Sequence, residues 1–267
     1  MLDARLAEFA TAYSLHRRAE GRELSDEELL SLPWLTTGPQ AGQWAVRAKT
    51  YEAFVDRLLE PLSHQVSQPL TVLDLGAGNG WLSYRVAGRG HRAIALDIRG
   101  DSIEGLGSSE IFQERCPGRI EPMVASFDAV PLPDDLVDIA VFNASLHYAT
   151  DLGKVLGEAA RVTRPGGRIA ILDSPFYPSE ADGLAMQAEK QKLAAAMFGE
   201  RAASLTGLPF IEFLTRDRLA AASAGLGLAW TRHRVSYPPR HELRPLIARL
   251  RGRRRPSRFD LWVADVP

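Results

Sequence analysis

A chain of 267 residues, 45% of them hydrophobic and 24% charged, is long enough to bury a substantial core as one domain with a small appendage. Its single cysteine, Cys116, excludes an intrachain disulfide and a cysteine-rich metal site. No stretch approaches the roughly 18 consecutive apolar residues of a membrane span, and the first residues lack the pattern of a secretory signal. We therefore expect a cytoplasmic protein with no membrane partner.

The net charge of -1 conceals an arginine-rich segment, since residues 231–258 contain ten arginines and Glu242 as the sole acidic residue. Such a segment can meet RNA, anionic lipid or a phosphorylated substrate. Surface arginines are more often solvated or paired with carboxylates, so a nucleic-acid partner is not favoured. The 28 arginines against lysines at only four positions are typical of a GC-rich bacterial genome.

The first sixty residues have helical patterns. Apolar residues between Leu2 and Arg22 follow helical spacing, and the Ser-Asp-Glu-Glu run from Ser25 resembles a helix N-cap and an acidic first turn. A connector over 33–42 contains proline and glycine, and a further helix is predicted over 43–59. We predict an N-terminal helical cap or lid over 1–62, followed by the main domain over 63–267.

After Pro69, short apolar runs alternate with helical segments, which is typical of a parallel sheet with crossover helices. Strands are predicted over 71–75, 92–97, 121–125, 137–143 and 168–173, with two closing strands over 228–237 and 259–266. Helices are predicted over 80–89, 101–114, 151–163, 180–198 and 215–225, with 164–167 (Arg-Pro-Gly-Gly) ending the third of these. The expected fold is α/β, a Rossmann-like and mostly parallel sheet of about seven strands with helices on both faces.

The most informative stretch runs from Val72 to Ser83, where an apolar strand leads through glycines at 76, 78 and 80 into a helix. A dinucleotide fingerprint needs a third glycine where this chain has Trp81. Asp74 would also set a carboxylate close to a pyrophosphate. S-adenosylmethionine (SAM) has an ammonium and a sulfonium but no phosphate, so the loop suits SAM better than NAD. Asp97 ends the next strand, where a carboxylate can accept hydrogen bonds from ribose hydroxyls or simply cap a turn.

Residues 70–175 resemble the class I SAM-dependent methyltransferases, in particular bacterial members that act on small molecules. The resemblance is carried by Val72–Gly80, Ala95–Ile98, Ala125–Asp138 and Ala160–Leu172, in the order and spacing of that family's motifs. It implies transfer of a methyl group from SAM to an acceptor that the motifs do not identify.

The resemblance also implies roles for individual residues. Asp74 and the loop of Gly76, Ala77, Gly78 and Gly80 would hold the methionine part of SAM, Asp97 the ribose, and Ile98 one face of the adenine. Ser126 stands where the family often has an aspartate facing the adenine amino group, and the neighbouring Phe127 would offer its backbone N–H to the ring. Asn143 would lie beside the sulfonium.

Two further residues have competing interpretations. His147 is a candidate general base, because its ordinary pKa suits that role near neutrality, but a packed structural histidine is at least as well supported. Trp44, Arg47 and Tyr51 share one helical face, which either covers the cofactor, with Arg47 pairing with the SAM carboxylate, or packs into the core with Arg47 at its rim. Packing is slightly favoured.

Several other functions remain to be weighed. The chain lacks the Asn-Pro-Pro-Tyr type of motif that grips a planar amide or amino group, and it shows no metal-ligand cluster, so no metal is expected. An NAD-dependent oxidoreductase, a non-catalytic SAM-binding protein and an RNA methyltransferase using the arginines from 249 to 258 are the alternatives. Acceptor choice is expected to lie in the helical cap and in a substrate-side insertion over 174–215.

Overall fold

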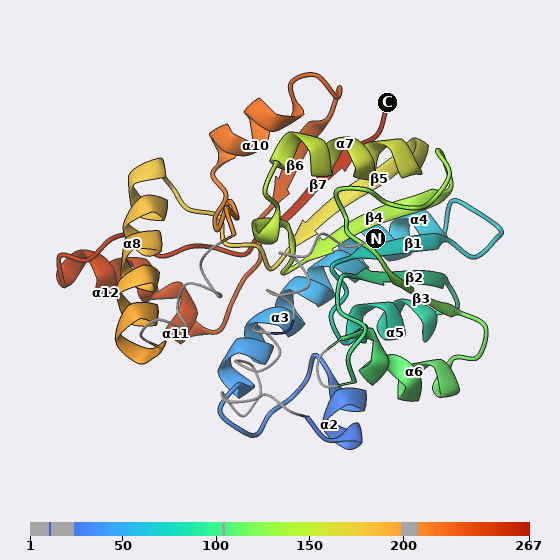
Figure 1. The fold of residues 1–267 in the computed structure, drawn as a ribbon, viewed down its shortest axis with the longest axis horizontal. Coiled ribbons are helices and arrows are strands. Elements are labelled where there is room, and N and C mark those ends of the chain that lie inside the picture. Colours follow the sequence, from blue (N-terminus) through green and yellow to red (C-terminus); the bar gives the residue numbers. More distant parts are fainter. Residues whose placement is uncertain (1–10, 12–23, 103–104, 199–207) are drawn as a thin grey trace.

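The computed structural model describes residues 11, 24–102, 105–198 and 208–267, and it centres on one seven-stranded sheet with strand order β3-β2-β1-β4-β5-β7-β6 (Figure 1). The strands are β1 (Thr71–Leu75), β2 (Arg92–Asp97), β3 (Ile120–Val124), β4 (Val137–Asn143), β5 (Thr163–Leu172), β6 (Ala229–His233) and β7 (Leu261–Asp265). Neighbouring strands from β3 to β5 are parallel, and only β7 runs against its neighbours. The predicted Rossmann-like α/β sheet is confirmed.

Helices cover both faces of this sheet. Figure 1 shows α7 and α10 over one face and α3, α5 and α6 over the other. The helices are α2 (Asp26–Ser31), α3 (Ala41–Phe54), a π-helical continuation (Val55–Leu59), α4 (Glu60–Ser63), α5 (Trp81–Ala87), α6 (Glu110–Arg115), α7 (Leu152–Val162), α8 (Glu180–Phe198), α10 (Arg216–Ser223), α11 (Pro239–Glu242) and α12 (Arg244–Leu250). Short 3-10 turns lie at Leu106–Ser109 and Leu146–Tyr148. Among the described helices, none combines the length and the apolar character needed to cross a bilayer.

Successive side chains along a strand point to opposite faces of the sheet, and each face has its own hydrophobic core. In β1, Val72 packs into the core shared with α3 and α5, whereas Leu73 and Leu75 pack into the core shared with α7 and α10. Strands buried on both faces need apolar residues at nearly every position, which is why they were readable as continuous apolar runs.

Helices α2 and α3 pack into the same core as the sheet. Ser25 begins α2 with a capping box, since its backbone N–H donates to Glu28 Oε2 at 2.9 Å and its side chain accepts from the Glu28 N–H at 3.3 Å. Trp44 and Tyr51 of α3 are buried, and both rings meet Trp81 of α5 edge-on with centroids 5.7 Å apart. This arrangement fits the packing interpretation of the Trp44–Tyr51 face. The helix predicted over 2–22 lies, apart from Thr11, outside the described residues, and the division at residue 62 stays a prediction.

Other predicted bounds differ in detail. Helix α7 does end before the Arg-Pro-Gly-Gly run, but residues 164–167 bulge within β5, where Thr163 pairs with Val137 and Arg168 with Ile139. The single helix predicted over 101–114 is wrong in extent, because its described part forms a 3-10 turn and the short α6. The strand predicted over 228–237 is only five residues long, and α11 and α12 follow it without having been predicted.

Candidate active site

A cavity of about 1130 Å³ opens at the carboxyl ends of β1, β2, β4 and β5, where parallel α/β sheets usually bind ligands. Its wall contains ten of the twelve predicted site residues: Arg47, Gly76, Ala77, Gly78, Asp97, Ile98, Ser126, Phe127, Asn143 and His147. Asp74 and Gly80 lie off this wall. Segments far apart in the sequence therefore build one site.

The glycine loop after β1 is shaped by close backbone approaches. Gly76, Gly78 and Gly80 all have positive φ, at 78°, 58° and 80°, and a Cβ on Gly76 would lie 2.4 Å from Ser145 Cβ. The N–H groups of Gly76 and Ala77 both donate to the Leu96 carbonyl, at 2.8 and 2.9 Å. The loop is thus held between the ends of β2 and β4, with no room for a side chain at Gly76.

Asp97 connects the end of β2 to this loop. Its Oδ2 accepts a hydrogen bond from the Gly78 N–H at 2.7 Å, and its Oδ1 accepts from the Arg99 N–H at 2.9 Å. Burial raises the pKa of Asp97, while the nearby Arg99 guanidinium and these N–H groups act in the opposite direction. A carboxylate held in this way faces the cavity with limited freedom to turn.

Asp74 lies beneath the loop and does not line the cavity. Because side chains alternate along β1, its carboxylate points toward α5, where its Oδ2 accepts a hydrogen bond from Ser83 Oγ at 3.0 Å. Its Oδ1 has no hydrogen-bond partner among the described residues, and burial raises the pKa of Asp74 to about 7. Any effect on a ligand in the cavity therefore passes through the loop.

Two of the predicted site residues that line the cavity carry a side-chain atom that is buried without a hydrogen-bond partner in the described structure, namely Asn143 Oδ1 and His147 Nδ1. Burial, with Lys190 and Arg47 as neighbouring cations, lowers the pKa of His147 to about 3. The histidine is therefore neutral near pH 7, where it can accept or donate a hydrogen bond but is a weak base. Phe127, also in the cavity wall, meets Phe142 edge-on with ring centroids 6.1 Å apart.

Asp173, which the sequence reasoning missed, lies directly after β5 in the same cavity wall. Asp173 is only 6% exposed, neither carboxylate oxygen has a hydrogen-bond partner among the described residues, and its φ is +49°. Burial raises the pKa of Asp173, and the Arg47 cation and the nearby Thr50 hydroxyl oppose that rise. A buried carboxylate whose oxygens lack well-formed hydrogen bonds is costly, and non-glycine residues with positive φ are frequent at functional sites, so Asp173 is a candidate for ligand contact.

Arg47 reaches the cavity from α3. Its guanidinium lies 4.8 Å from the centre of the Trp44 ring, which the core holds in place through Trp81. A cation supported by a buried aromatic ring is positioned to meet an anionic group in the cavity. Trp44 and Tyr51 are packed, as the packing interpretation expects, and Trp44 and Arg47 also line the cavity. Pairing of Arg47 with the SAM carboxylate stays a prediction.

Comparisons with known proteins agree with this geometry. Residues 73–171 match the family model described as "Methyltransferase domain". The chain is 33% identical over 112 residues to the ubiquinone/menaquinone biosynthesis C-methyltransferase UbiE of Francisella tularensis, a match that covers 40% of this chain and 44% of that protein. It is 38% identical over 98 residues to the malonyl-[acyl-carrier protein] O-methyltransferase of Yersinia pestis, covering 37% and 34% of the two chains.

The matched region spans less than half of these curated relatives. Among solved structures, the geranyl diphosphate C-methyltransferase of Streptomyces coelicolor A3(2), in complex with Mg²⁺, geranyl diphosphate and S-adenosyl-L-homocysteine, superposes with a TM-score of 0.61, at 15% identity and over 99% of this chain and 98% of that chain. At this identity the likeness supports the fold alone. The family model, the motifs and the sheet order agree in assigning a class I methyltransferase domain to residues 73–171.

Proposed function

We propose that this protein transfers the methyl group of SAM to a small-molecule acceptor. The observation that carries the proposal is the meeting of the glycine loop, Asp97 and Asn143 in one cavity that continues to Asp173. Bound SAM would supply a methyl group already activated by its sulfonium. What the chain must add is positioning and the exclusion of water.

The cofactor half of the cavity is assigned from its polar groups. The loop from Gly76 to Gly80 and Asn143 would hold the methionine part, with Arg47 at its carboxylate. Asp97 would accept from the ribose hydroxyls with the lone pairs that the Gly78 and Arg99 N–H groups leave available. Ile98, Ser126 and Phe127 would surround the adenine. The unpartnered Asn143 Oδ1 supports this assignment, because a buried polar atom is expected to find a partner in the working complex.

The acceptor half lies between Asp173, His147 and an apolar wall that includes Pro175, Phe210 and Phe259. Pro175 and Phe210 both come from the segment 174–215, which supports its proposed role on the substrate side. An acceptor O–H or N–H that must lose its proton would transfer it to the Asp173 carboxylate more readily than to His147, because His147 is a weak base. We therefore place the base at Asp173 and a hydrogen-bonding role at His147.

The test is a methyl-transfer assay with SAM tritiated in the methyl group, run against separate pools of phenols, amines, carboxylates and acyl thioesters. A positive pool is resolved by mass, since one methyl transfer replaces a hydrogen by CH₃. Asp173→Asn should keep SAM binding within about twofold but slow transfer by roughly a hundredfold or more, the usual scale for loss of a general base. SAM binding with no labelled product from any pool would favour the non-catalytic SAM-binding alternative.

A further inference from the structure

Helix α12 carries an apolar stripe that no described part of the chain covers. Leu243, Leu246, Ile247 and Leu250 are 50%, 55%, 41% and 77% exposed, and α12 has no buried residue. Their spacing of three, four and seven positions from Leu243 places all four on one side of the helix. Single exposed leucines are common on protein surfaces, but a complete stripe is typical of a contact surface.

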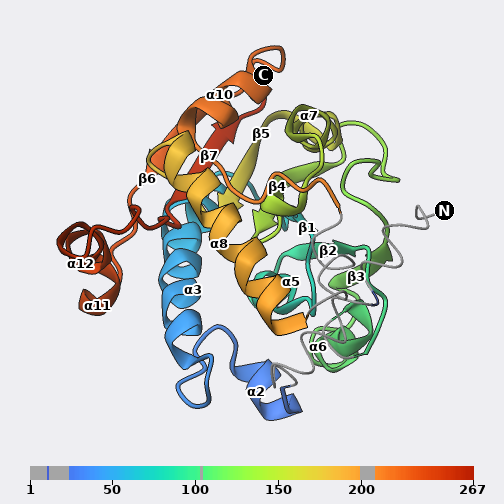
Figure 2. The same ribbon diagram turned by 60° about the vertical axis from the view of Figure 1, so that its left-hand side comes forward.

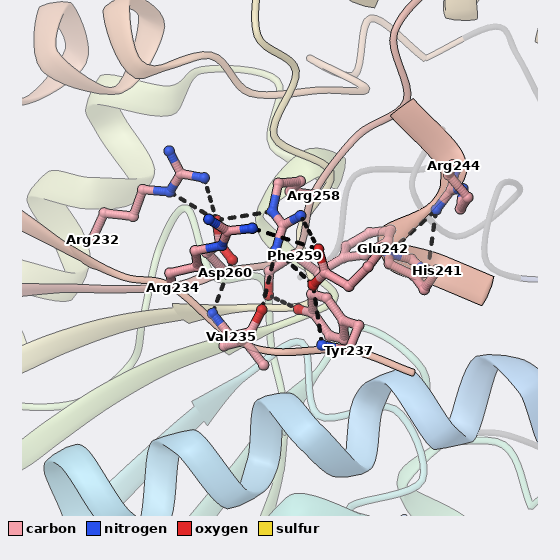
Figure 3. Close-up of polar contacts among 10 residues, drawn as sticks. All are labelled: Arg232, Arg234, Val235, Tyr237, His241, Glu242, Arg244, Arg258, Phe259 and Asp260. Carbon is pink, nitrogen blue, oxygen red and sulfur yellow. Dashed lines mark hydrogen bonds and ion pairs between the residues drawn. The ribbon is translucent and has the colours of Figure 1, made fainter. Parts of the chain in front are cut away.

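Some arginines around α11 and α12 form ion pairs, including Arg254 and Arg255 with Glu189 and Asp182 of α8, and others do not. Arginines at the base of the segment are neutralised: Arg258 donates to both oxygens of Glu242, at 3.0 and 3.1 Å, and Arg232 pairs with the buried Asp260 (Figure 3). Four others are exposed and form no ion pair within the described structure: Arg240, Arg249, Arg251 and Arg253. The uncompensated positive charge thus gathers around the apolar stripe.

The residues that connect α11 to the rest of the protein form several hydrogen bonds and ring contacts. Glu242 also accepts a hydrogen bond from the Tyr237 N–H at 3.1 Å, and the Arg258 guanidinium lowers the pKa of Glu242 to about 2. His241 packs between Tyr237 and Phe259, with ring centroids 4.7 and 6.1 Å away. Because Phe259 lines the cavity, α11 is joined to the wall of the candidate active site. Figures 1 and 2 both show α11 and α12 projecting at the edge of the molecule.

Helical geometry sets guanidinium groups on both sides of the stripe. At 100° per residue, Arg249 lies on one side and Arg244 and Arg251 on the other, each about a quarter turn or more from the line of leucines. Helices that lie in a membrane interface combine apolar residues on one face with flanking lysines or arginines at the level of the headgroups. A projecting ridge of this kind can enter a bilayer surface without a matching groove.

The apolar stripe and its flanking arginines also argue against other binding partners for α12. A second copy of α12 would bring arginines against arginines, since residues 243–259 contain no acidic residue. RNA phosphates would pair with the arginines but would leave the four apolar side chains in water. We propose that α12 and the arginines flanking it dock this protein on an anionic lipid surface. This proposal departs from the expectation of no membrane partner, which rested on the absence of a membrane-spanning segment, because docking on a lipid surface needs no such segment.

Sedimentation of the full chain with phospholipid vesicles tests the proposal. At 100 mM NaCl the chain should bind vesicles of phosphatidylcholine with 30% phosphatidylglycerol, and should bind pure phosphatidylcholine much more weakly. The variant Leu246→Ser with Leu250→Ser, and the variant Arg249→Gln with Arg251→Gln, should each weaken binding by about tenfold or more. Raising NaCl to 500 mM should weaken wild-type binding in the same way.

Matched controls come from other surfaces. Leu184 and Leu193 of α8 are similarly exposed, and Arg115 at the end of α6 is exposed, so Leu184→Ser with Leu193→Ser, and Arg115→Gln, should bind like the wild type. All variants should keep the wild-type unfolding midpoint and SAM affinity, which separates this proposal from the proposed function.

Three outcomes would overturn the proposal. The first is absence of binding to the anionic vesicles. The second is wild-type binding by the leucine variant, which would place the contact elsewhere. The third is a preference for another partner in place of lipid, seen as RNA binding that depends on the arginines alone or as self-association that the leucine variant abolishes.

Discussion

The Asp97 carboxylate accepts a hydrogen bond from the Gly78 N–H at 2.7 Å, so the end of β2 holds the glycine loop that follows β1. Two separate sequence motifs thereby form one wall of the cavity.

Removing that carboxylate should weaken SAM binding. Asp97→Ala loses the contact to the loop and the proposed acceptor for the ribose hydroxyls, which we expect to cost about tenfold to a hundredfold in affinity, the scale of hydrogen bonds to charged groups. Asp97→Asn should lose less, since it keeps one acceptor oxygen. Calorimetric titration with SAM measures both, with the exposed Glu114→Ala as a control. Unchanged affinity in Asp97→Ala would remove Asp97 from the site.

A methyl group at Gly76 should be far more damaging than one at another glycine of positive φ. A Cβ at Gly76 would meet Ser145 Cβ at 2.4 Å, whereas a Cβ at Gly118, where φ is +69°, would have nothing within 4 Å. Gly118→Ala should lower the free energy of unfolding by about 1–2 kcal/mol through backbone strain alone. Gly76→Ala should lower it further and abolish SAM binding. Urea denaturation compares the two, and equal losses would contradict the close approach of the loop to Ser145.

Asp74 should make stability fall as the pH rises. Its pKa in the folded protein, about 7, is above that of an unfolded aspartate, so the protonated form is favoured in the fold and its contribution is lost between about pH 4 and pH 7. The full effect is of the order of 4 kcal/mol. Asp74→Asn should flatten the pH dependence of the free energy of unfolding over this window, while Glu114→Gln should not. Parallel curves for wild type and Asp74→Asn would show that the buried carboxyl is not the source.

His147 should remain neutral across the physiological range. Its pKa of about 3 lies below that of an unfolded histidine, so the fold loses stability as the pH falls from about 6.5 toward 3. Imidazole nitrogen NMR should show a neutral ring at pH 5. A protonation midpoint between pH 6 and 7 would instead restore His147 as a general base.

The sequence was most informative where one physical requirement dominates. Strands buried on both faces must be apolar, so the sheet was predictable. The loop after β1 was predictable because a Cβ at Gly76 would lie only 2.4 Å from Ser145 Cβ, so that position must be glycine. The direction of Asp74 was not, because it depends on which face of β1 meets α5. Asp173 gave no spacing signal, since a lone aspartate after a strand is also common in turns.

The end of the chain was the hardest to predict for a related reason. Helices α11 and α12 bury no residue, so no contact with the core imposes a recognisable apolar pattern on their sequence. Their arginines are therefore interpreted from the sequence as solvent-exposed. Only the structure shows that some of these arginines pair with Glu242 and Asp260 while others surround an exposed apolar stripe.

The most direct measurement is calorimetric titration of the wild-type protein with SAM, with S-adenosylhomocysteine and with NAD. We predict micromolar binding of SAM and S-adenosylhomocysteine at one site per chain and no heat from NAD. Absence of SAM binding, or a preference for NAD, would contradict the assignment of this cavity to methyl transfer.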